Sequence, residues 1–304
     1  TPYPTLFPYT TLFRSVLWDN LPSGKKLGGA PLNVLVRLRA LGADCAIISS
    51  RGADADGDEI QRQIEEKNVS TALLQTCPDQ PTSLVEVAIN KCGVATYDIV
   101  YPCAWDRITL RDEALARVAE SDAFVFGSLC TRDPVTRQTL ETILDHTAGT
   151  DTFKVFDVNL REPHYTHERV LSLMKRADMA KLNDDELYEL AVAFGSKHRS
   201  IDQNVRFLAR LAGLERMCVT LGPHGALYFA DDEMHFHTGF RVEVADTVGS
   251  GDSFLAGLIY KLLNGASPDE ALDFACALGA MVATHIGPTP TIETEEIERF
   301  RHPV

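Results

Sequence analysis

Alternating strand-like and helix-like segments from about Ala123 onward predict an α/β fold with a mostly parallel central sheet. Short apolar runs typical of strands lie at 124–126, 154–158, 180–182 and 218–221. The segments between them carry helical periodicity near 135–144, 169–176, 184–194 and 203–211. Because strand–helix–strand units give parallel pairing, we expect helices to flank both faces of this sheet.

The stretch 81–106 interrupts this alternation. Residues 84–89 and 97–101 read as two strands around a turn at Asn90–Gly93, with no helix between them. Such an antiparallel insertion is a candidate lid, and an ordinary surface hairpin is an equal alternative. By analogy alone, we assign Trp105 to the lid rather than to the core.

Composition indicates one globular domain with no affinity for nucleic acid or membranes. The chain has 304 residues, of which 45% are apolar and 24% are charged. Its net charge of -14 disfavours nucleic acid and anionic membranes as partners. No apolar run approaches the roughly 18 residues of a transmembrane helix. The seven cysteines are scattered and form no Cys-x-x-Cys pair, so we expect a reduced, cytoplasmic location.

Residues 1–15 differ in character from the rest of the chain. The run Thr5–Ser15 is what one reading frame of a widely used sequencing adaptor encodes. We therefore interpret residues 1–15 as a non-native segment, exclude them from the expected fold, and take 16–304 as the single domain. A natural aromatic-rich tail is the alternative, and sequencing the native locus across the junction distinguishes the two.

The segment most informative about chemistry is the turn Gly249-Ser250-Gly251, which Asp252 follows. Apolar residues recur at helical spacing over 254–263, so the turn lies at a helix N-terminus. Glycines there let backbone N–H groups converge on an anion, and the helix dipole adds to the attraction. Asp252 then suits a base that takes a proton from an alcohol attacking phosphorus. Simple capping of the helix is the alternative.

Other phosphate-site signatures are absent from the sequence. It has no Gly-x4-Gly-Lys-Ser/Thr loop, no His-Arg-Asp loop and no Gly-x-Gly-x-x-Gly after a strand. Instead, Asp246–Asp252 resembles the C-terminal signature of the ribokinase (PfkB) family. Gly28–Val34 resembles its N-terminal sugar-binding signature, in the form common among fructokinases. The resemblance runs from about 16 to 290 and implies a ribokinase-like fold with a small β-strand lid, from about 16–29 and 81–106.

Further segments match the family's motifs in the expected order, namely Val16–Asp19, Phe156–Arg161, Asn183–Glu186 and Thr220–Gly225. The resemblance implies that substrate is bound by Asp19, Gly28, Gly29, Asn33 and Arg161. It implies that nucleotide is bound by Asn183, Thr220, Gly222, Gly225 and Gly279. It also implies a magnesium ion near Asn183 and Glu186, held largely through water, and a potassium ion near Asp246 and the carbonyl of Val248.

The residue types fit these roles, although each has an alternative. Asp19 and Asn33 offer acceptors and donors for a polyhydroxy substrate, and both could instead be turn or cap residues. Arg161 carries the planar donor fork that matches phosphate oxygens. Asn183 and Glu186 share one face of a helix start, where they could address one hydrated ion or form a capping box.

Two departures from the family pattern stand out. The family begins with a buried strand where this chain has residues 1–15. If that central strand is lost, we expect a gap in the sheet and poor support for Asp19. The late helix that usually presents an Asn near the nucleotide has Cys276 in the matching neighbourhood, followed by Gly279.

Together these observations predict an ATP-dependent kinase that phosphorylates a hydroxyl of D-fructose, with ATP and Mg²⁺ as cofactors. The resemblance also implies K⁺ as a further cofactor. Another small substrate (ribose, a ketodeoxy sugar acid or a nucleoside) is an alternative, as is a non-catalytic or inactive relative. The expected partners are the sugar and ATP, and a homodimer through the lid is one expected assembly.

Overall fold

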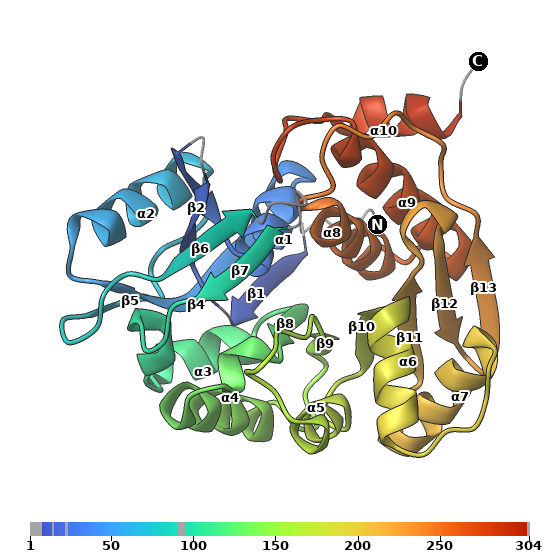
Figure 1. The fold of residues 1–304 in the computed structure, drawn as a ribbon, viewed down its shortest axis with the longest axis horizontal. Helices are drawn as coiled ribbons and strands as arrows, with labels where there is room; N and C mark the ends of the chain where they lie inside the picture. Colours follow the sequence, from blue (N-terminus) through green and yellow to red (C-terminus); the bar gives the residue numbers. More distant parts are fainter. Residues whose placement is uncertain (1–7, 14, 22–23, 90–94, 303–304) are drawn as a thin grey trace, which may run out of the picture.

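The computed structural model describes residues 8–13, 15–21, 24–89 and 95–302. Within them, a nine-stranded sheet runs through the molecule (Figure 1). In spatial order its strands are β13 (Glu233–His237), β12 (Ala226–Ala230), β11 (Arg216–Thr220), β10 (Met179–Asn183), β9 (Phe153–Asp157), β8 (Ala123–Gly127), β1 (Tyr9–Phe13), β4 (Asp44–Gly52) and β5 (Leu74–Cys77). Strands β11 to β5 pair in parallel, and β12 and β13 complete the sheet as an antiparallel edge.

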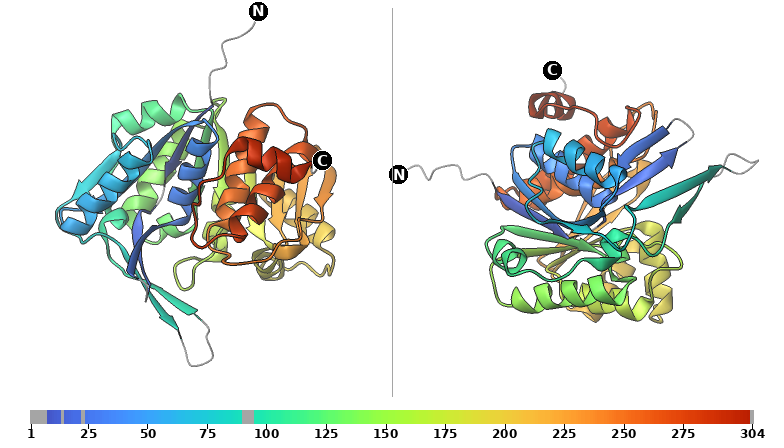
Figure 2. Two further views of the ribbon diagram at one scale, coloured as in Figure 1. Left: turned by 90° about the horizontal axis from the view of Figure 1, so that it is seen from above. Right: turned by 90° about the vertical axis from the view of Figure 1, so that its left-hand side faces the viewer.

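Helices cover both faces of this sheet, as Figures 1 and 2 show. One apolar core lies under α3 (Asp112–Ala119), α4 (Pro134–His146), α5 (His167–Met174), α6 (Asp184–Ala193) and α7 (Ile201–Ala212). The other lies under α1 (Ala30–Ala40), α2 (Ala55–Glu66), α8 (Ser250–Leu263) and α9 (Pro268–Ala283), with α10 (Thr294–Arg301) packed on α9. Among the described residues, no helix is both long enough and apolar enough to cross a bilayer.

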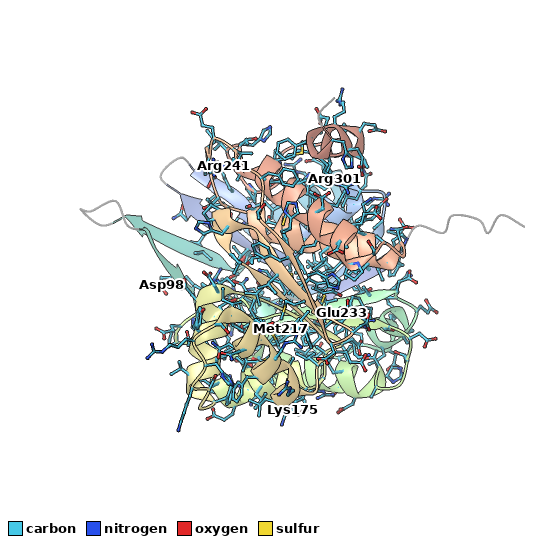
Figure 3. The ribbon with its side chains drawn as sticks, turned by 90° about the vertical axis from the view of Figure 1, so that its right-hand side faces the viewer. Asp98, Lys175, Met217, Glu233, Arg241 and Arg301 are labelled. Atoms are coloured by element: carbon cyan, nitrogen blue, oxygen red, sulfur yellow. The ribbon has the colours of Figure 1, made fainter. Side chains whose placement is uncertain are left out.

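The predicted α/β class is confirmed element by element. The predicted strands coincide with β8, β9, β10 and β11, and the predicted helices coincide with α4, α5, α6 and α7. Figure 3 views the layers from the antiparallel edge. Met217 of β11 lies in the sheet between the two helical layers, and Arg301 of α10 lies in the outer layer. The Arg301 guanidinium pairs with Asp273 of α9 at 2.5 Å, which ties the last helix to the fold.

Strand β1 occupies the middle of the large sheet. It pairs in parallel with β4 on one side and with β8 on the other. Its successive residues Leu12 and Phe13 are fully buried in the two opposite cores, and Phe13 meets Phe124 edge to face at 6.5 Å. Contrary to the expectation for residues 1–15, the described sheet therefore has no gap here. Threonine and aromatic residues suit a pleated, buried strand whatever their origin.

A second, four-stranded sheet projects from the body of the molecule (Figure 2). Its order is β3 (Gly24–Gly28), β2 (Leu17–Leu21), β6 (Leu84–Ile89) and β7 (Ala95–Ile99). Strands β2 and β6 are parallel, whereas the outer pairs are antiparallel. These strands come from the two stretches predicted to form the small β lid, and we call them the lid sheet. The predicted turn at Asn90–Gly93 lies outside the described residues.

The assignment of Trp105 to the lid was wrong. Trp105 lies in a short 3-10 helix, η1 (Ala104–Arg107), and is fully buried in the core under α3 and α4. The guanidinium of Arg132 stacks over its ring at 4.0 Å and pairs with buried Asp106 at 2.8 Å. Because Trp105 is fully buried beneath the Arg132 guanidinium, the chain has re-entered the body of the molecule before residue 104.

The position of β1 predicts the effect of truncating its core residue. Replacing Leu12 by alanine should lower the free energy of unfolding by about 2 to 5 kcal/mol, because it opens a cavity in the core between the sheet and helix α1. Denaturant unfolding measures this loss. Val192→Ala is the matched control, since Val192 is 72% exposed and its truncation should change stability by less than about 0.5 kcal/mol. Equal stability of the two variants would show that β1 is not part of the sheet.

Candidate active site

Two adjoining pockets open at the carboxyl ends of the parallel strands. Pocket A has a volume of about 700 Å³ and pocket B of about 790 Å³, which is the size range of small-molecule sites. Asn183, Thr220, Thr247 and Gly251 line both pockets. Ligands of open α/β sheets bind at this edge, outside the carboxyl ends of the strands. The predicted glycine turn therefore lies at the junction of two cavities.

Pocket A combines polar side chains with an aliphatic wall. Its polar lining includes Asp19, Asn33, Asn159, Arg161, Lys181 and Asp252. Its aliphatic wall is formed by Leu17, Val85, Ile99 and Leu129, which are all buried. The first three of these belong to strands β2, β6 and β7. The lid sheet thus forms one side of pocket A.

Asp252 lies in the first turn of α8, on the side of pocket A. The side-chain amide of Asn33 donates a hydrogen bond to Asp252 Oδ2 at 2.8 Å. Asn33 is buried in α1, which packs against α8, so the carboxylate is held by a rigid neighbour. The two residues, far apart in the sequence, meet in one site.

Asp19 enters pocket A from strand β2, and Gly28 makes room for it. Strands β2 and β3 pair so that Asp19 lies opposite Lys26. A Cβ atom on Gly28 would lie 2.0 Å from Asp19 Oδ2, so only glycine leaves space for the carboxylate. Burial raises the pKa of the Asp19 carboxyl above its usual value. Gly29 lines pocket A, whereas Gly28 acts by supporting Asp19.

The glycine turn is locked by backbone geometry. Gly249 has the left-handed φ of 77° that favours glycine, and a Cβ there would lie 2.5 Å from Pro288 Cα. Ser250 donates from Oγ to the carbonyl of Gly279 at 2.7 Å, which joins the start of α8 to α9. The amides of a helix's first turn have no acceptor within the helix. The Ser250 amide donates to the carbonyl of Thr247 at 3.2 Å, so it is the next amide, that of Gly251 beside both pockets, that can serve a bound anion.

Pocket B contains the predicted nucleotide-binding residues. Thr220, Gly222, Gly225 and Gly279 all line it, as does Ser250. The rest of its wall is largely apolar and comes from Phe240, Val242, Val244, Phe254, Cys276, Ala280 and Ala283. Burial raises the pKa of the Cys276 thiol to about 12, so that side chain stays neutral and acts as part of the apolar wall. Such a wall suits a planar, uncharged ring.

Asn183 and Glu186 form a capping box at the start of α6. Asn183 Oδ1 accepts from the amide of Glu186 at 2.8 Å, and Glu186 Oε2 accepts from the amide of Asn183 at 2.9 Å. Glu186 Oε1 also accepts from the amide of Leu160 at 2.8 Å. Burial raises the pKa of the Glu186 carboxyl, although Lys181 and these amides oppose that shift. Glu186 therefore holds the loop after β9 against α6, whereas Asn183 lines both pockets.

The oxygen donors at the carboxyl ends of the strands suit a magnesium ion only if phosphate oxygens complete its coordination. Among the described residues, no cluster of three or more His, Cys, Asp or Glu side chains is arranged to hold a metal ion. Oxygen donors such as those of Asn183 and Asp184 suit Mg²⁺, which usually keeps several waters and shares substrate phosphates. The metal roles of Asn183 and Glu186 stay predictions.

Asp246 joins two loops beside the glycine turn. Its Oδ1 accepts from the amide of Val248 and its Oδ2 accepts from the amide of Gly287, both at 3.0 Å. The carboxylate thus fixes the approach to Gly249 from two sides. The potassium site at Asp246 and Val248 stays a prediction.

Arg161 lies at the exposed side of pocket A. Its guanidinium donates to the carbonyl of Leu160 at 2.9 Å. The neighbouring Asn159 has a φ of 38°, which turns the chain after β9 so that residues 159–161 all border the pocket. The predicted contact of Arg161 with phosphate stays a prediction.

Sequence reasoning missed Lys181, which is a pocket residue. Its ammonium lies 3.4 Å from Asp157 Oδ1, and its side chain is only 12% exposed. The signal was available, because Ala180 and Leu182 alternate with it along β10 and are fully buried. A lysine within a strand of an otherwise apolar parallel sheet is rare unless it is paired.

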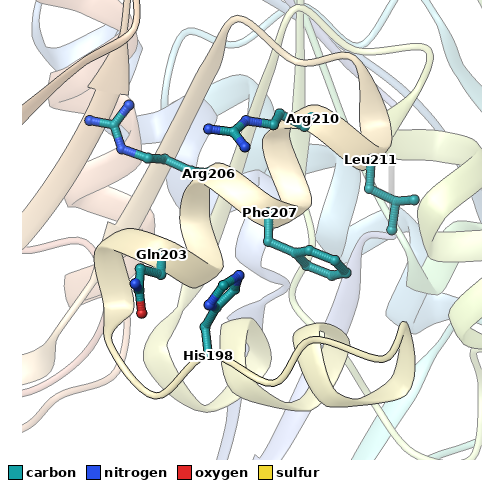
Figure 4. A pocket seen from close by; sticks show the side chains of 6 residues that line it. All are labelled: His198, Gln203, Arg206, Phe207, Arg210 and Leu211. Carbon is teal, nitrogen blue, oxygen red and sulfur yellow. The ribbon is translucent and has the colours of Figure 1, made fainter.

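A third pocket, of about 500 Å³, lies on α7 and the segment before it (Figure 4). It is lined by His198, Gln203, Arg206, Phe207, Arg210 and Leu211. His198 and Phe207 meet edge to face, and Arg206 pairs with Asp202 and Asp232. This pocket contains none of the predicted site residues, and we assign no role to it.

Sequence comparisons identify related kinases. The chain is similar to a probable chloroplastic fructokinase-6 of Arabidopsis thaliana, with 27% identity over 95% of the chain and 81% of the relative. It is 29% identical to the aminoimidazole riboside kinase of Salmonella typhimurium, over 86% of the chain and 82% of the relative.

A solved structure shows the same fold. The crystal structure of the Vibrio cholerae O395 fructokinase in its fructose, ADP and calcium ion bound form superposes with a TM-score of 0.84, at 24% identity over 97% of this chain and 99% of that one. The sequence profile of the pfkB family carbohydrate kinases matches residues 23–295. The chain therefore belongs to the pfkB family of carbohydrate kinases, enzymes that transfer phosphate to an alcohol group of a sugar.

Proposed function

We propose that this sugar kinase transfers the terminal phosphoryl group of ATP to a hydroxyl of D-fructose. The observation that carries the proposal is the position of Asp252. It lines pocket A, is held by Asn33, and adjoins the glycine turn that pocket A shares with pocket B. A sugar in pocket A and a nucleotide in pocket B would meet at this carboxylate.

The proposed reaction needs a base, an anion site and a dry cavity. Asp252 accepts the proton of the attacking sugar hydroxyl, the oxygen bonds to the terminal phosphorus, and the bond from that phosphorus to ADP breaks. The amides at the Gly249–Gly251 turn stabilise the charge on the transferred group. The lid sheet, which already walls pocket A, excludes water that would otherwise hydrolyse ATP.

The cations of the site have separate proposed places. A magnesium ion carried with the nucleotide neutralises phosphate charge when bound, and Asn183 lies where it can orient the waters of that ion. Asp246 and the carbonyl of Val248 are the groups that would hold potassium. With or without a bound potassium ion, Asp246 holds the loop before Gly249 through its hydrogen bonds to the amides of Val248 and Gly287.

The choice of fructose rests on the polar end of pocket A and on the relatives. Asp19, Asn33 and Asn159 offer the mixture of donors and acceptors that suits a neutral polyol. The cations that line this pocket are Lys181 and exposed Arg161, so a sugar phosphate has less support. Fructokinases are among the similar proteins.

A riboside is the second candidate, because one side of pocket A is aliphatic. Leu17, Val85, Ile99 and Leu129 could cover a planar base attached to a ribose. The similar aminoimidazole riboside kinase acts on such a compound, as its name states.

A substrate panel tests the choice between these candidates. The specificity constant kcat/KM with ATP should be highest for D-fructose among fructose, ribose, adenosine and aminoimidazole riboside. Coupled detection of ADP formation measures it for each compound. A higher value for the riboside would show that the aliphatic wall, rather than the polar end, sets specificity.

Asp252→Asn tests the proposed base. The change keeps size but removes the proton acceptor, so kcat should fall by about two to four orders of magnitude while ADP affinity stays within a factor of two. Steady-state kinetics and calorimetry measure the two quantities. Asp151→Asn is the control, since Asp151 is exposed and remote from both pockets. A kcat near that of the control would refute the role of Asp252.

Gly28→Ala tests the support of Asp19. The added methyl would overlap the Asp19 carboxylate, so the acid must move and lose its bond to the sugar. We expect KM for the sugar to rise roughly 10- to 100-fold, the worth of one hydrogen bond to a charged group. ADP affinity, measured on the same sample, should not change. An unaltered KM would mean that Asp19 does not contact the sugar.

A further inference from the structure

Lys181 is a charged side chain inside the large sheet, and the roles proposed above do not use it. It lies in register between Asp157 on β9 and Cys218 on β11, so all three side chains share one face of the sheet. Its ammonium contacts Asp157 Oδ1 at 3.4 Å. The rest of the side chain is surrounded by buried strands.

The surroundings keep this amine protonated. Burial by itself lowers the pKa of Lys181, but the carboxylates of Asp157, Glu186 and Asp252 more than offset that effect and raise the pKa above its usual value. Cys218, the remaining titratable neighbour, is a neutral thiol because burial raises its pKa strongly. Lys181 is therefore a cation at neutral pH.

The ammonium reaches the point where the transferred group would stand. A Cβ atom built on Gly251 would have Lys181 Nζ as its nearest neighbour, at 3.7 Å. Lys181 also lines pocket A together with Gly251 and Asp252. An ammonium has three N–H donors, and the hydrogen bond to Asp157 uses one of them.

We propose that Lys181 donates a hydrogen bond to a non-bridging oxygen of the phosphoryl group in transfer, and that Asp157 orients the ammonium for this contact. The inference rests on the proposed function, because it places the terminal phosphate of ATP at the glycine turn. Lys181 keeps its proton throughout, so the step adds charge stabilisation and no further bond making or breaking.

A cation is needed here for a physical reason. Asp252 and Asp157 would repel an incoming phosphate, because like charges a few ångströms apart in a poorly solvated site interact strongly. A lysine that served only to neutralise Asp157 would not need to reach Gly251. Its position beside the turn lets one ammonium offset both carboxylates and bind the anion.

The test separates phosphate binding from structural charge balance. Removing Lys181 alone would leave Asp157 as an unpaired buried charge, which can unfold a protein. We therefore compare two variants: a double variant that carries both Lys181→Met and Asp157→Asn, and a single variant that carries only Asp157→Asn. Circular dichroism confirms that both are folded. Calorimetry with Mg²⁺ then gives the affinities for ADP and for the non-hydrolysable ATP analogue AMP-PNP.

The expected result is specific for the terminal phosphate. Relative to Asp157→Asn, the double variant should bind AMP-PNP at least about tenfold more weakly, the worth of one charge-assisted hydrogen bond, and bind ADP within a factor of two. Its kcat should fall by about 100-fold or more. Lys181→Arg, which keeps the charge, should retain part of the preference for AMP-PNP over ADP.

Two other outcomes would overturn the inference. Equal loss for both nucleotides would make Lys181 a structural residue, and unchanged affinity for both would exclude the phosphate contact. Because the two nucleotide affinities are measured without sugar, they leave the proposed acceptor untouched. A wild-type protein that bound neither nucleotide would refute the proposed function and this inference together.

Discussion

The hydrogen bond from Asn33 to Asp252 is the contact on which the arrangement of the site depends. It joins α1, which follows strand β3 of the lid sheet, to α8, which begins at the glycine turn. Because α1 and α8 pack along their length, the lid strands and the proposed base keep a fixed relation. Asp19, held against Gly28 just before α1, belongs to the same rigid assembly.

Charge balance within the site follows from this arrangement. The chain is acidic overall, with a net charge of -14, yet the proposed function requires it to bind a highly charged anion. The proposed anion contacts, the helix-start amides at Gly251 and the buried Lys181, would act at short range, where total charge matters little. The buried carboxylates of Asp157 and Glu186 then keep that lysine charged. For binding an anion, the positions of a few nearby groups thus matter more than the net charge of the chain.

Strand β1 shows how far local sequence can mislead about a fold. Its residues resemble adaptor-encoded sequence, yet Leu12 and Phe13 are buried in opposite cores of the sheet. A central position between β4 and β8 demands an extended backbone and buried side chains on both faces. Leu12 and Phe13 supply apolar groups, and the buried hydroxyl of Thr11 is paired with Ser121 Oγ at 2.7 Å.

The sequence by itself determined the α/β class, the helix start at Gly249–Asp252 and the order of the motifs, because periodicity, turn chemistry and capping are local properties. Only the tertiary structure decided that Asp252 meets Asn33, that Trp105 lies in the core, and that Lys181 faces the glycine turn. Each of these depends on which strands and helices become neighbours. Burial and ion pairing between residues distant in the chain exist only once those elements have packed.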